Sequence, residues 1–352
     1  MSDSNKGVKL KELSIDDYKI FKNFKISFCG KRDNPLPVIL LVGVNGSGKT
    51  TILESIQNSY NTGTKLKIFY ENKTIDADSF GGINADKIVP KGHNINDVKN
   101  NLIYISFNRS LEDIKELLPK HIKKLIYEND IKASEVYKNI KDEINNIFES
   151  LDIKVEFSRR DAEGNIYFKN KISKEEFTID HLSTGEKTLL SKVLYLYFKD
   201  VKNQIILIDE PELSLHPAWQ NRVLKLYENF AIKNNCQIII ATHSPQIIGS
   251  AKPEYLRILT FQDNNVKVLD NFNKSYGLEF SKVLLDIMGV EELRALEVEE
   301  KFIKLKRYIQ EKDSKRFVEL FTELEDILGS DDTDLQLLKL QANLKGLNVS
   351  SS

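Results

Sequence analysis

Residues 43–50 read Gly-Val-Asn-Gly-Ser-Gly-Lys-Thr and directly follow a short, wholly apolar run at 38–42. Glycines at this spacing let backbone N–H groups close around phosphate oxygens at the start of a helix. Three apolar side chains follow at helical spacing: Ile52, Leu53 and Ile56. The segment therefore predicts a buried strand, a phosphate-binding loop and a helix. In such a loop Lys49 reaches the β- and γ-phosphates and Thr50 gives its hydroxyl to Mg²⁺, whereas a glycine-rich turn without function is the alternative.

A second apolar run, at 205–208, ends in the two carboxylates Asp209 and Glu210. Open α/β sheets bind their ligands at the carboxyl ends of strands. Asp209 fits the acceptor role on the Mg²⁺ side, and Glu210 fits the task of polarising a water that attacks a γ-phosphate. An Asp-Glu pair after a strand is also common in ordinary solvated turns, so this assignment depends on the loop at 43–50.

Two shorter motifs stand beside a predicted helix and a predicted strand. Ser183 and Gly185 precede a helical stretch at 187–198, where a hydroxyl and a backbone N–H can face an anion. Ser-x-Gly is, however, a frequent helix cap. His243 follows a buried-strand candidate at 238–240 and is expected at the same sheet edge as the two carboxylates. A lone histidine at such a place is usually structural.

The composition limits the class of protein. The chain has 352 residues, enough for about two domains at roughly 150 residues each. Lys and Arg total 51 against 52 Asp and Glu, so no global basic excess indicates a nucleic-acid binder. Cys29 and Cys236 lack the spacing of a disulfide framework or a zinc site. We see no signal peptide and no apolar run of about 18–20 residues, and we expect a cytoplasmic protein without membrane association.

The remaining pattern predicts an α/β fold with additions. Alternating side chains in the first 30 residues predict an antiparallel strand pair. Helical spacing predicts a short helical insertion at about 110–150, followed by a strand pair that turns at 161–165. We therefore expect an α/β domain at 1–275 that includes an antiparallel β subdomain, and a C-terminal helical region at 276–352.

The order of four segments resembles the ATP-binding-cassette (ABC) ATPases, which are P-loop NTPases. The segments are the loop at 43–50, Leu-Ser-Thr-Gly-Glu at 182–186, the Asp-Glu strand with its continuation at 206–217, and Ala-Thr-His-Ser-Pro at 241–245. The resemblance covers residues 8 to about 270. It is to the soluble branch of SMC, RecF and OLD (overcoming-lysogenization-defect) proteins, because Asp-Glu-Pro-Glu-Leu-Ser-Leu-His-Pro stands where transporters typically have an Asp-Glu-Pro-Thr-Ser-Ala-Leu-Asp-like segment. The opening Tyr18-Lys-Ile-Phe is similar to the RecF-type start.

The resemblance implies a role for each matching residue in the nucleotide site. The residues around the phosphates of ATP would be Gly43, Asn45, Gly46, Ser47, Gly48, Lys49, Thr50 and Thr51. Thr50 and Asp209 would hold Mg²⁺. Glu210 would be the catalytic base, and His243 would contact the γ-phosphate. Together with Lys49 these two residues would form the catalytic set.

The resemblance also implies that one copy of the chain is not enough. ATP in this superfamily is sandwiched between two head-to-tail cassettes, so Ser183 and Gly185 would complete the nucleotide site of a second, facing copy. We therefore expect at least a head-to-tail homodimer. The Gln loop of the superfamily has no secure match, and Asn108 and Arg109 occupy the expected region.

The function implied is that of an ATPase, which converts ATP and water into ADP and phosphate. Among ABC-type ATPases the chain is similar to the ATPase subunits of bacterial anti-phage systems such as Septu, the retron-linked systems and PARIS. Such subunits regulate a separately encoded effector, a nuclease or a toxin. The compact cassette and the helical C-terminal region agree with this interpretation.

Two other functions remain open at this point. A RecF-like ATPase of DNA maintenance or repair would bind duplex DNA, and the basic cluster Lys120, Lys123 and Lys124 could meet its phosphates. Three lysines on a helix are more often a solvated face, and the near-neutral total charge disfavours nucleic acid as a partner. The energy-coupling subunit of a transporter is disfavoured by the sequence after Glu210.

Overall fold

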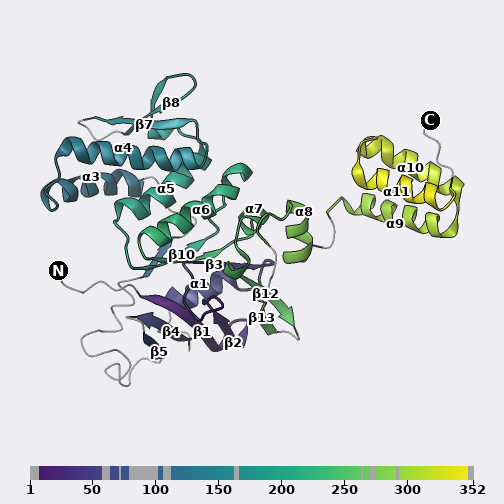
Figure 1. The fold of residues 1–352 in the computed structure, drawn as a ribbon, viewed down its shortest axis with the longest axis horizontal. Coiled ribbons are helices and arrows are strands. Elements are labelled where there is room, and N and C mark those ends of the chain that lie inside the picture. Colours follow the sequence, from purple (N-terminus) through teal and green to yellow (C-terminus); the bar gives the residue numbers. More distant parts are fainter. Residues whose placement is uncertain are drawn as a thin grey trace. The chain divides into compact units, whose positions relative to one another are not determined.

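The computed structural model describes residues 8–57, 64–70, 73–78, 102–105, 112–161, 166–262, 265–269, 275–290 and 293–347. The chain separates into two compact units, Met1–Met288 and Gly289–Ser352. Each unit has its own apolar core (Figure 1).

A six-stranded sheet forms the centre of the first unit, in the order β13-β12-β3-β11-β10-β6. Its strands are β3 (Val38–Gly43), β6 (Leu102–Ile105), β10 (Ile205–Asp209), β11 (Gln237–Ala241), β12 (Leu256–Gln262) and β13 (Asn265–Leu269). Neighbouring strands are parallel except for the β12–β13 pair. Every residue of β3, β10 and β11 is buried, as expected for apolar strands that are covered on both faces. The predicted α/β sheet is thereby confirmed.

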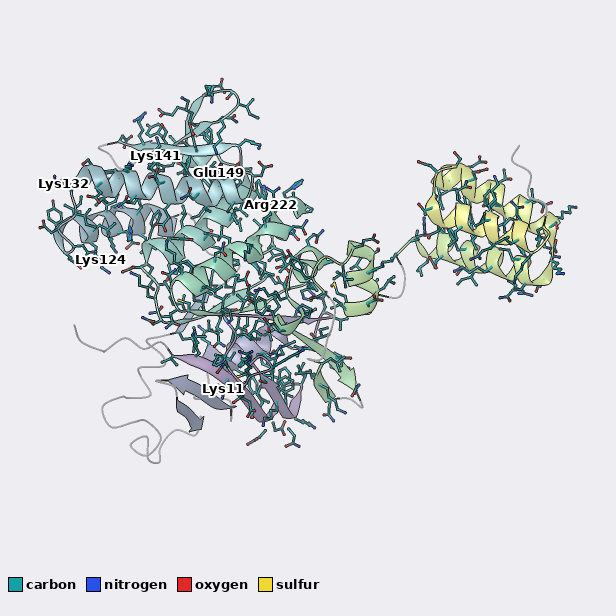
Figure 2. The ribbon with its side chains drawn as sticks, in the orientation of Figure 1. Lys11, Lys124, Lys132, Lys141, Glu149 and Arg222 are labelled. Carbon is teal, nitrogen blue, oxygen red and sulfur yellow. The ribbon has the colours of Figure 1, made fainter. Side chains whose placement is uncertain are left out.

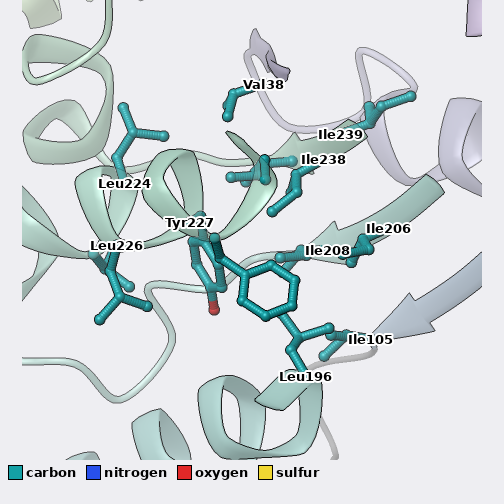
Figure 3. Close-up of a cluster of buried hydrophobic side chains, with 14 of the residues drawn as sticks. Val38, Ile105, Leu196, Ile206, Ile208, Leu224, Leu226, Tyr227, Ile238 and Ile239 are labelled. Atoms are coloured by element: carbon teal, nitrogen blue, oxygen red, sulfur yellow. The ribbon is translucent and has the colours of Figure 1, made fainter. Parts of the chain in front are cut away.

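Helices α1 (Lys49–Gln57) and α6 (Pro217–Lys233) cover opposite faces of this sheet (Figure 1). Figure 3 shows side chains of α6, Tyr227 among them, turned toward the isoleucines of β10 and β11. Helix α5 (Thr184–Phe198) contributes Leu196 to the same apolar cluster. The carboxyl ends of β3, β10 and β11 therefore open onto one edge, where the loops to the helices begin.

The predicted N-terminal strand pair is present and belongs to a second, antiparallel sheet. Its strands are β1 (Lys9–Tyr18), β2 (Phe21–Ser27), β4 (Thr64–Tyr70) and β5 (Lys73–Asp78), in the order β2-β1-β4-β5. Leu13 pairs with Ile26 and Ile15 with Phe24, and all four side chains are buried. The period of two in the sequence therefore marks the buried face of this sheet.

The predicted helical insertion consists of two helices and is followed by a small antiparallel sheet. The elements are α3 (Glu112–Tyr127), α4 (Ala133–Ser150), β7 (Val155–Arg160), β8 (Ile166–Asn170) and β9 (Glu176–Thr178). The strand pair β7–β8 was predicted from its alternation, whereas β9 was not. With only three residues and none of them fully buried, β9 has no periodic signal to find.

The second unit contains α9 (Leu296–Glu311), α10 (Ser314–Leu328) and α11 (Thr333–Leu344). Asp313 and Asp332 cap α10 and α11 by accepting backbone hydrogen bonds, which satisfies N–H groups that a helix start leaves free. Phe317 and Phe321 stack in its core with ring centroids 5.7 Å apart. No helix in the described part of the chain is long and apolar enough to span a membrane.

Candidate nucleotide site

The loop between β3 and α1 has the backbone geometry that its glycines require. Gly46 and Gly48 have φ angles of 79° and 93°, in the left-handed region that favours glycine. A Cβ on Gly43 would lie 2.6 Å from the Ser47 Oγ, so a side chain there would block the turn. Val44, Asn45 and Gly46 form the exposed tip of this loop. The chain therefore presents a narrow, glycine-lined turn at the start of a nine-residue helix.

Lys49 lies folded into this loop and is almost fully buried, with 5% of its surface exposed. Its Nζ donates to the carbonyl oxygens of Gly43 at 2.8 Å and Val44 at 3.1 Å. Burial lowers the pKa of Lys49 to about 8, although nearby carboxylates act to raise it. The Ser47 hydroxyl is buried without a hydrogen-bond partner among the described residues. A buried cation and an unpaired hydroxyl in one loop fit the oxygens of a polyphosphate.

The Asp209 carboxylate sits between two hydroxyl groups at the end of β10. Thr50 Oγ1 donates to Asp209 Oδ1 at 3.3 Å, and the Tyr104 hydroxyl of β6 donates to Asp209 Oδ2 at 3.2 Å. Burial raises the pKa of Asp209, while these two hydrogen bonds oppose the increase. Thr50 and Asp209 thus place two hard oxygen ligands side by side, which is the donor set that Mg²⁺ prefers.

Glu210 has an unusual backbone conformation. Its φ angle is 45°, which is strained for a residue with a side chain and more so because Pro211 follows. The Glu210 N–H donates to the Ala241 carbonyl at 2.9 Å. In this conformation the Glu210 carboxylate reaches His243, with Oε1 3.7 Å from Nε2. Strain of this kind at a sheet edge is typical of functional residues.

His243 is neutral at pH 7 in this environment. Burial lowers its pKa, and the positive charge of Lys49 lowers it further. The approach of His243 to Glu210 is therefore not an ion pair near neutral pH, and the imidazole can offer one nitrogen as donor and the other as acceptor. The sequence predicts His243 at the same edge as Asp209 and Glu210, and the structure brings all three together with Lys49.

Glu212 connects the Asp-Glu segment to the histidine segment. Glu212 Oε1 accepts from Thr242 Oγ1 at 2.7 Å and from the His243 backbone N–H at 2.6 Å. The other carboxylate oxygen is buried without a partner within the described part of the chain, and burial raises the Glu212 pKa. Neither Glu212 nor Tyr104 was assigned a role from the sequence. Glu212 follows the predicted Asp-Glu pair closely in sequence, whereas Tyr104 lies within β6.

Ser183 and Gly185 lie at the start of α5. Ser183 is the N-cap: its Oγ accepts from the Glu186 N–H, and Glu186 Oε2 accepts from the Ser183 N–H. This reciprocal pair is a capping box. A Cβ on Gly185 would lie 2.7 Å from the Ser214 carbonyl oxygen, so the glycine lets the helix start approach the chain after β10. The helix cap is thus present, and Ser183 and Thr184 at the helix start are exposed.

Two further predictions concern the Gln-loop region and the lysine cluster. Asn108 and Arg109 are outside the described residues. In the lysine cluster, Lys120 pairs with Glu116 and Lys124 with Asp200, so two of the three charges are balanced locally. Lys124 lies on the helical insertion (Figure 2).

A family model described as "AAA domain, putative AbiEii toxin, Type IV TA system" matches residues 95–249. The Septu protein PtuA of Bacillus thuringiensis is 24% identical over 402 aligned positions, which cover 94% of this chain and 97% of that protein. The Retron Vc95 probable ATPase of Vibrio cholerae serotype O1 biovar El Tor is 33% identical over 144 residues, which cover 38% of this chain and 27% of the relative.

Among solved structures, an SMC head bound to the C-winged helix domain of ScpA matches with a TM-score of 0.50. The sequence identity is 16%, and the match covers 74% of this chain and 97% of that one. The matched part of this chain therefore shares its fold with that SMC head.

Proposed function

We propose that this chain is an ABC-type ATPase that binds ATP with Mg²⁺ and hydrolyses the γ-phosphate, and its similarity to Septu PtuA and the retron ATPase and its fold support this. The observation that supports this best is the convergence of Lys49, the Thr50–Asp209 pair and the Glu210–His243 pair on one sheet edge. These groups are the parts that phosphoryl transfer to water needs.

Each part has a task that follows from its surroundings. Lys49 exchanges the carbonyls of Gly43 and Val44 for the β- and γ-phosphates, which restores the charge that burial disfavours. The Ser47 hydroxyl gains the partner that it lacks. Mg²⁺, when bound, neutralises negative charge on the phosphates. Thr50 and Asp209 are the residues that would hold it.

The attacking water belongs on the Glu210 side of the site. The Glu210 carboxylate accepts its proton as the water oxygen bonds to the γ-phosphorus and the bond from that phosphorus to the bridging oxygen breaks, which releases ADP; this is general-base catalysis. His243 reaches Glu210 Oε1 through Nε2, so a neutral imidazole at that place can orient the water or contact the γ-phosphate. Glu212 accepts a 2.6 Å hydrogen bond from the His243 backbone N–H. This bond fixes the backbone position from which the His243 side chain extends.

We further propose that Ser183 and Gly185 act on the nucleotide of a second copy. Both residues sit at the start of a 15-residue helix, where backbone N–H groups and the helix dipole favour a phosphate. Two copies in head-to-tail arrangement would then enclose two ATP molecules, each between the loop of one copy and the α5 start of the other.

The biological role that we propose is regulation of a separately encoded effector, a nuclease or a toxin, in anti-phage defence. Support comes from the alignment with Septu PtuA, which runs through 97% of that protein, and from the retron ATPase match. The lysine cluster gives duplex DNA less support as a partner, because Lys120 pairs with Glu116 and Lys124 with Asp200.

A complementation experiment tests both catalysis and pairing. Lys49→Ala should not hydrolyse ATP, Ser183→Arg should bind ATP but not hydrolyse it, and each should be inactive alone. Mixed in equal amounts, they form heterodimers in which one of two sites has an intact Lys49 and an intact Ser183. Random pairing should restore about one quarter of the wild-type turnover if the two sites act independently, and less than that if each copy also needs its own α5 engaged.

The controls separate the two parts of the proposal. Glu210→Gln should bind ATP, turn over slowly and remain paired in size-exclusion chromatography. A wild-type turnover number that does not depend on protein concentration, together with no recovery in the mixture, would refute pairing. Unchanged hydrolysis in Glu210→Gln would remove Glu210 from the base role.

A further inference from the structure

The α5 helix carries a lysine on its buried side. Lys192 is 1% exposed and is among the largest fully buried side chains of the protein. A buried ammonium group lowers stability unless it is hydrogen-bonded, and burial lowers the pKa of Lys192 to about 8 against the attraction of Glu212, Asp209 and Glu210. An apolar side chain at this position would pack without that cost. The presence of a charged donor therefore needs a reason that packing does not supply.

The ammonium group of Lys192 is directed at the backbone of the catalytic segment. Its Nζ donates to the Glu210 main-chain carbonyl at 3.2 Å. The Glu210 N–H is held by the Ala241 carbonyl of β11 at 2.9 Å. Glu210 is thus fixed on both sides of its Cα, by β11 on the amino side and by α5 on the carbonyl side.

This double attachment matters because the conformation of Glu210 is strained. A φ angle of 45° is outside the extended region that a residue before proline prefers. The Glu210 carbonyl also accepts from the Leu213 N–H at 3.3 Å, within the same turn. Without Lys192 this turn hydrogen bond remains, but no donor from α5 holds the carbonyl, and the Glu210 backbone is freer to relax toward the extended region. Relaxation would turn the carboxylate away from His243, which it now approaches to 3.7 Å.

A second contact joins α5 to the same segment. Gly185, in the first turn of α5, packs so closely on the Ser214 carbonyl that a Cβ would lie 2.7 Å from that oxygen. The helix therefore touches the chain after β10 at two points, one near its start and one at Lys192. Since an α-helix moves as a rigid rod over this length, a shift of its start also moves the Lys192 ammonium group.

We propose that Lys192 is a positioning residue that couples the start of α5 to the catalytic carboxylate by holding the Glu210 carbonyl. The inference rests on the proposed function, in which the α5 start docks on the nucleotide of a second copy. Docking would hold α5 in one position. The Lys192 ammonium group would then hold the Glu210 carbonyl, which orients the Glu210 carboxylate toward the attacking water. Hydrolysis in each copy would thus depend on whether its own α5 is engaged by the other copy.

The test compares Lys192→Met with the wild-type protein. Methionine has a similar length but neither charge nor donor. We expect kcat for ATP hydrolysis to fall by about tenfold to a hundredfold, the loss typical of a misplaced catalytic group. The affinity for ATP and the KM should stay within twofold, and the ATP-bound pair should persist longer in size-exclusion chromatography. A purely structural role would instead lower the melting temperature and weaken pairing.

Two further variants complete the experiment. Lys199→Met, at the exposed C-terminal end of α5, is the matched control and should hydrolyse ATP at the wild-type rate. Lys192→Gln keeps an N–H donor and should have an intermediate kcat; if Lys192→Met does not fold, this variant decides. A kcat within twofold of wild type in the folded variant would overturn the role of Lys192. The proposed function would be unaffected by that result provided that wild type hydrolyses ATP and Lys49→Ala does not.

Discussion

Replacing Lys49 by methionine should make the nucleotide-free protein more stable at neutral pH while removing its response to ATP. Lys49 is 5% exposed, and its pKa falls from 10.5 to about 8 on folding. A fall of that size corresponds to about 3 kcal/mol of folding free energy lost by burying the charge. Methionine cannot donate to the Gly43 and Val44 carbonyls. The loss of these hydrogen bonds lowers the free energy of unfolding by about 1 kcal/mol. The net gain is about 2 kcal/mol, or about 5 °C in melting temperature for a unit of this size.

The pH dependence follows from the sign of the shift. The folded-state pKa lies below the unfolded-state pKa, so the cost is fully present below pH 8, where Lys49 is charged in both states. It disappears as the pH rises through the window between about 8 and 10.5. The difference between Lys49→Met and wild type should therefore be largest at pH 7 and clearly smaller at pH 9.5.

The assay is thermal unfolding with and without Mg²⁺-ATP. Free ATP at a thousand times its Kd stabilises a binding-competent protein by about 4 kcal/mol, so wild type should then melt above Lys49→Met, reversing their order. Lys267→Met, at an exposed position of β13, is the control and should follow wild type throughout. A Lys49→Met protein that melts below wild type at pH 7 without nucleotide would refute the reasoning. A difference in melting temperature between the two proteins that is as large at pH 9.5 as at pH 7 would refute it as well.

Two more substitutions test the surroundings of the site and the second unit. Tyr104→Phe removes one of the two hydroxyl groups that orient Asp209 and should raise the Mg²⁺ concentration for half-maximal ATP hydrolysis by about tenfold. Tyr127→Phe, at an exposed tyrosine, is the control and should leave this Mg²⁺ concentration unchanged. Equal half-maximal Mg²⁺ concentrations for both variants would exclude a role of Tyr104 at the metal. Phe317→Ala should destabilise the 289–347 unit by about 3–5 kcal/mol and expose it to proteolysis, whereas the exposed Val318→Ala should not. ATP hydrolysis within twofold of wild type is expected for both, and resistance of Phe317→Ala to the protease would contradict the core assignment.

The sequence predicted those parts of the molecule in which several residues repeat a signal. The strand β3, its loop and α1 carry glycines, a lysine and a threonine at fixed spacing, and β10 and β11 are apolar runs that end in polar groups. The β1–β2 pair was found from its period of two. In each case local spacing alone determines the structure, so an isolated stretch of chain is enough to recognise it.

The contacts that complete the site have no such local signal. Tyr104 meets Asp209 only because β6 pairs with β10, and Glu212 meets the His243 backbone only because β10 and β11 are neighbours. Lys192 lies in a helical stretch where a lysine is ordinarily a surface residue. Its burial depends on where α5 lies relative to the end of β10, and that is a property of the topology and not of the stretch itself.

The ionisable groups at this edge indicate why nucleotide should act on the whole first unit. The pKa values of Lys49 and Lys192 are lowered, and those of Asp209 and Glu212 are raised. Each shift is toward the neutral form, so the cost of desolvation exceeds the attraction between opposite charges at every one of these positions. The nucleotide-free site is therefore held in place by the surrounding sheet and helices at a cost in free energy, and its charges do not stabilise it. A polyanion at Lys49 relieves part of that cost, which links nucleotide binding to the stability of β3, β10 and α5 together.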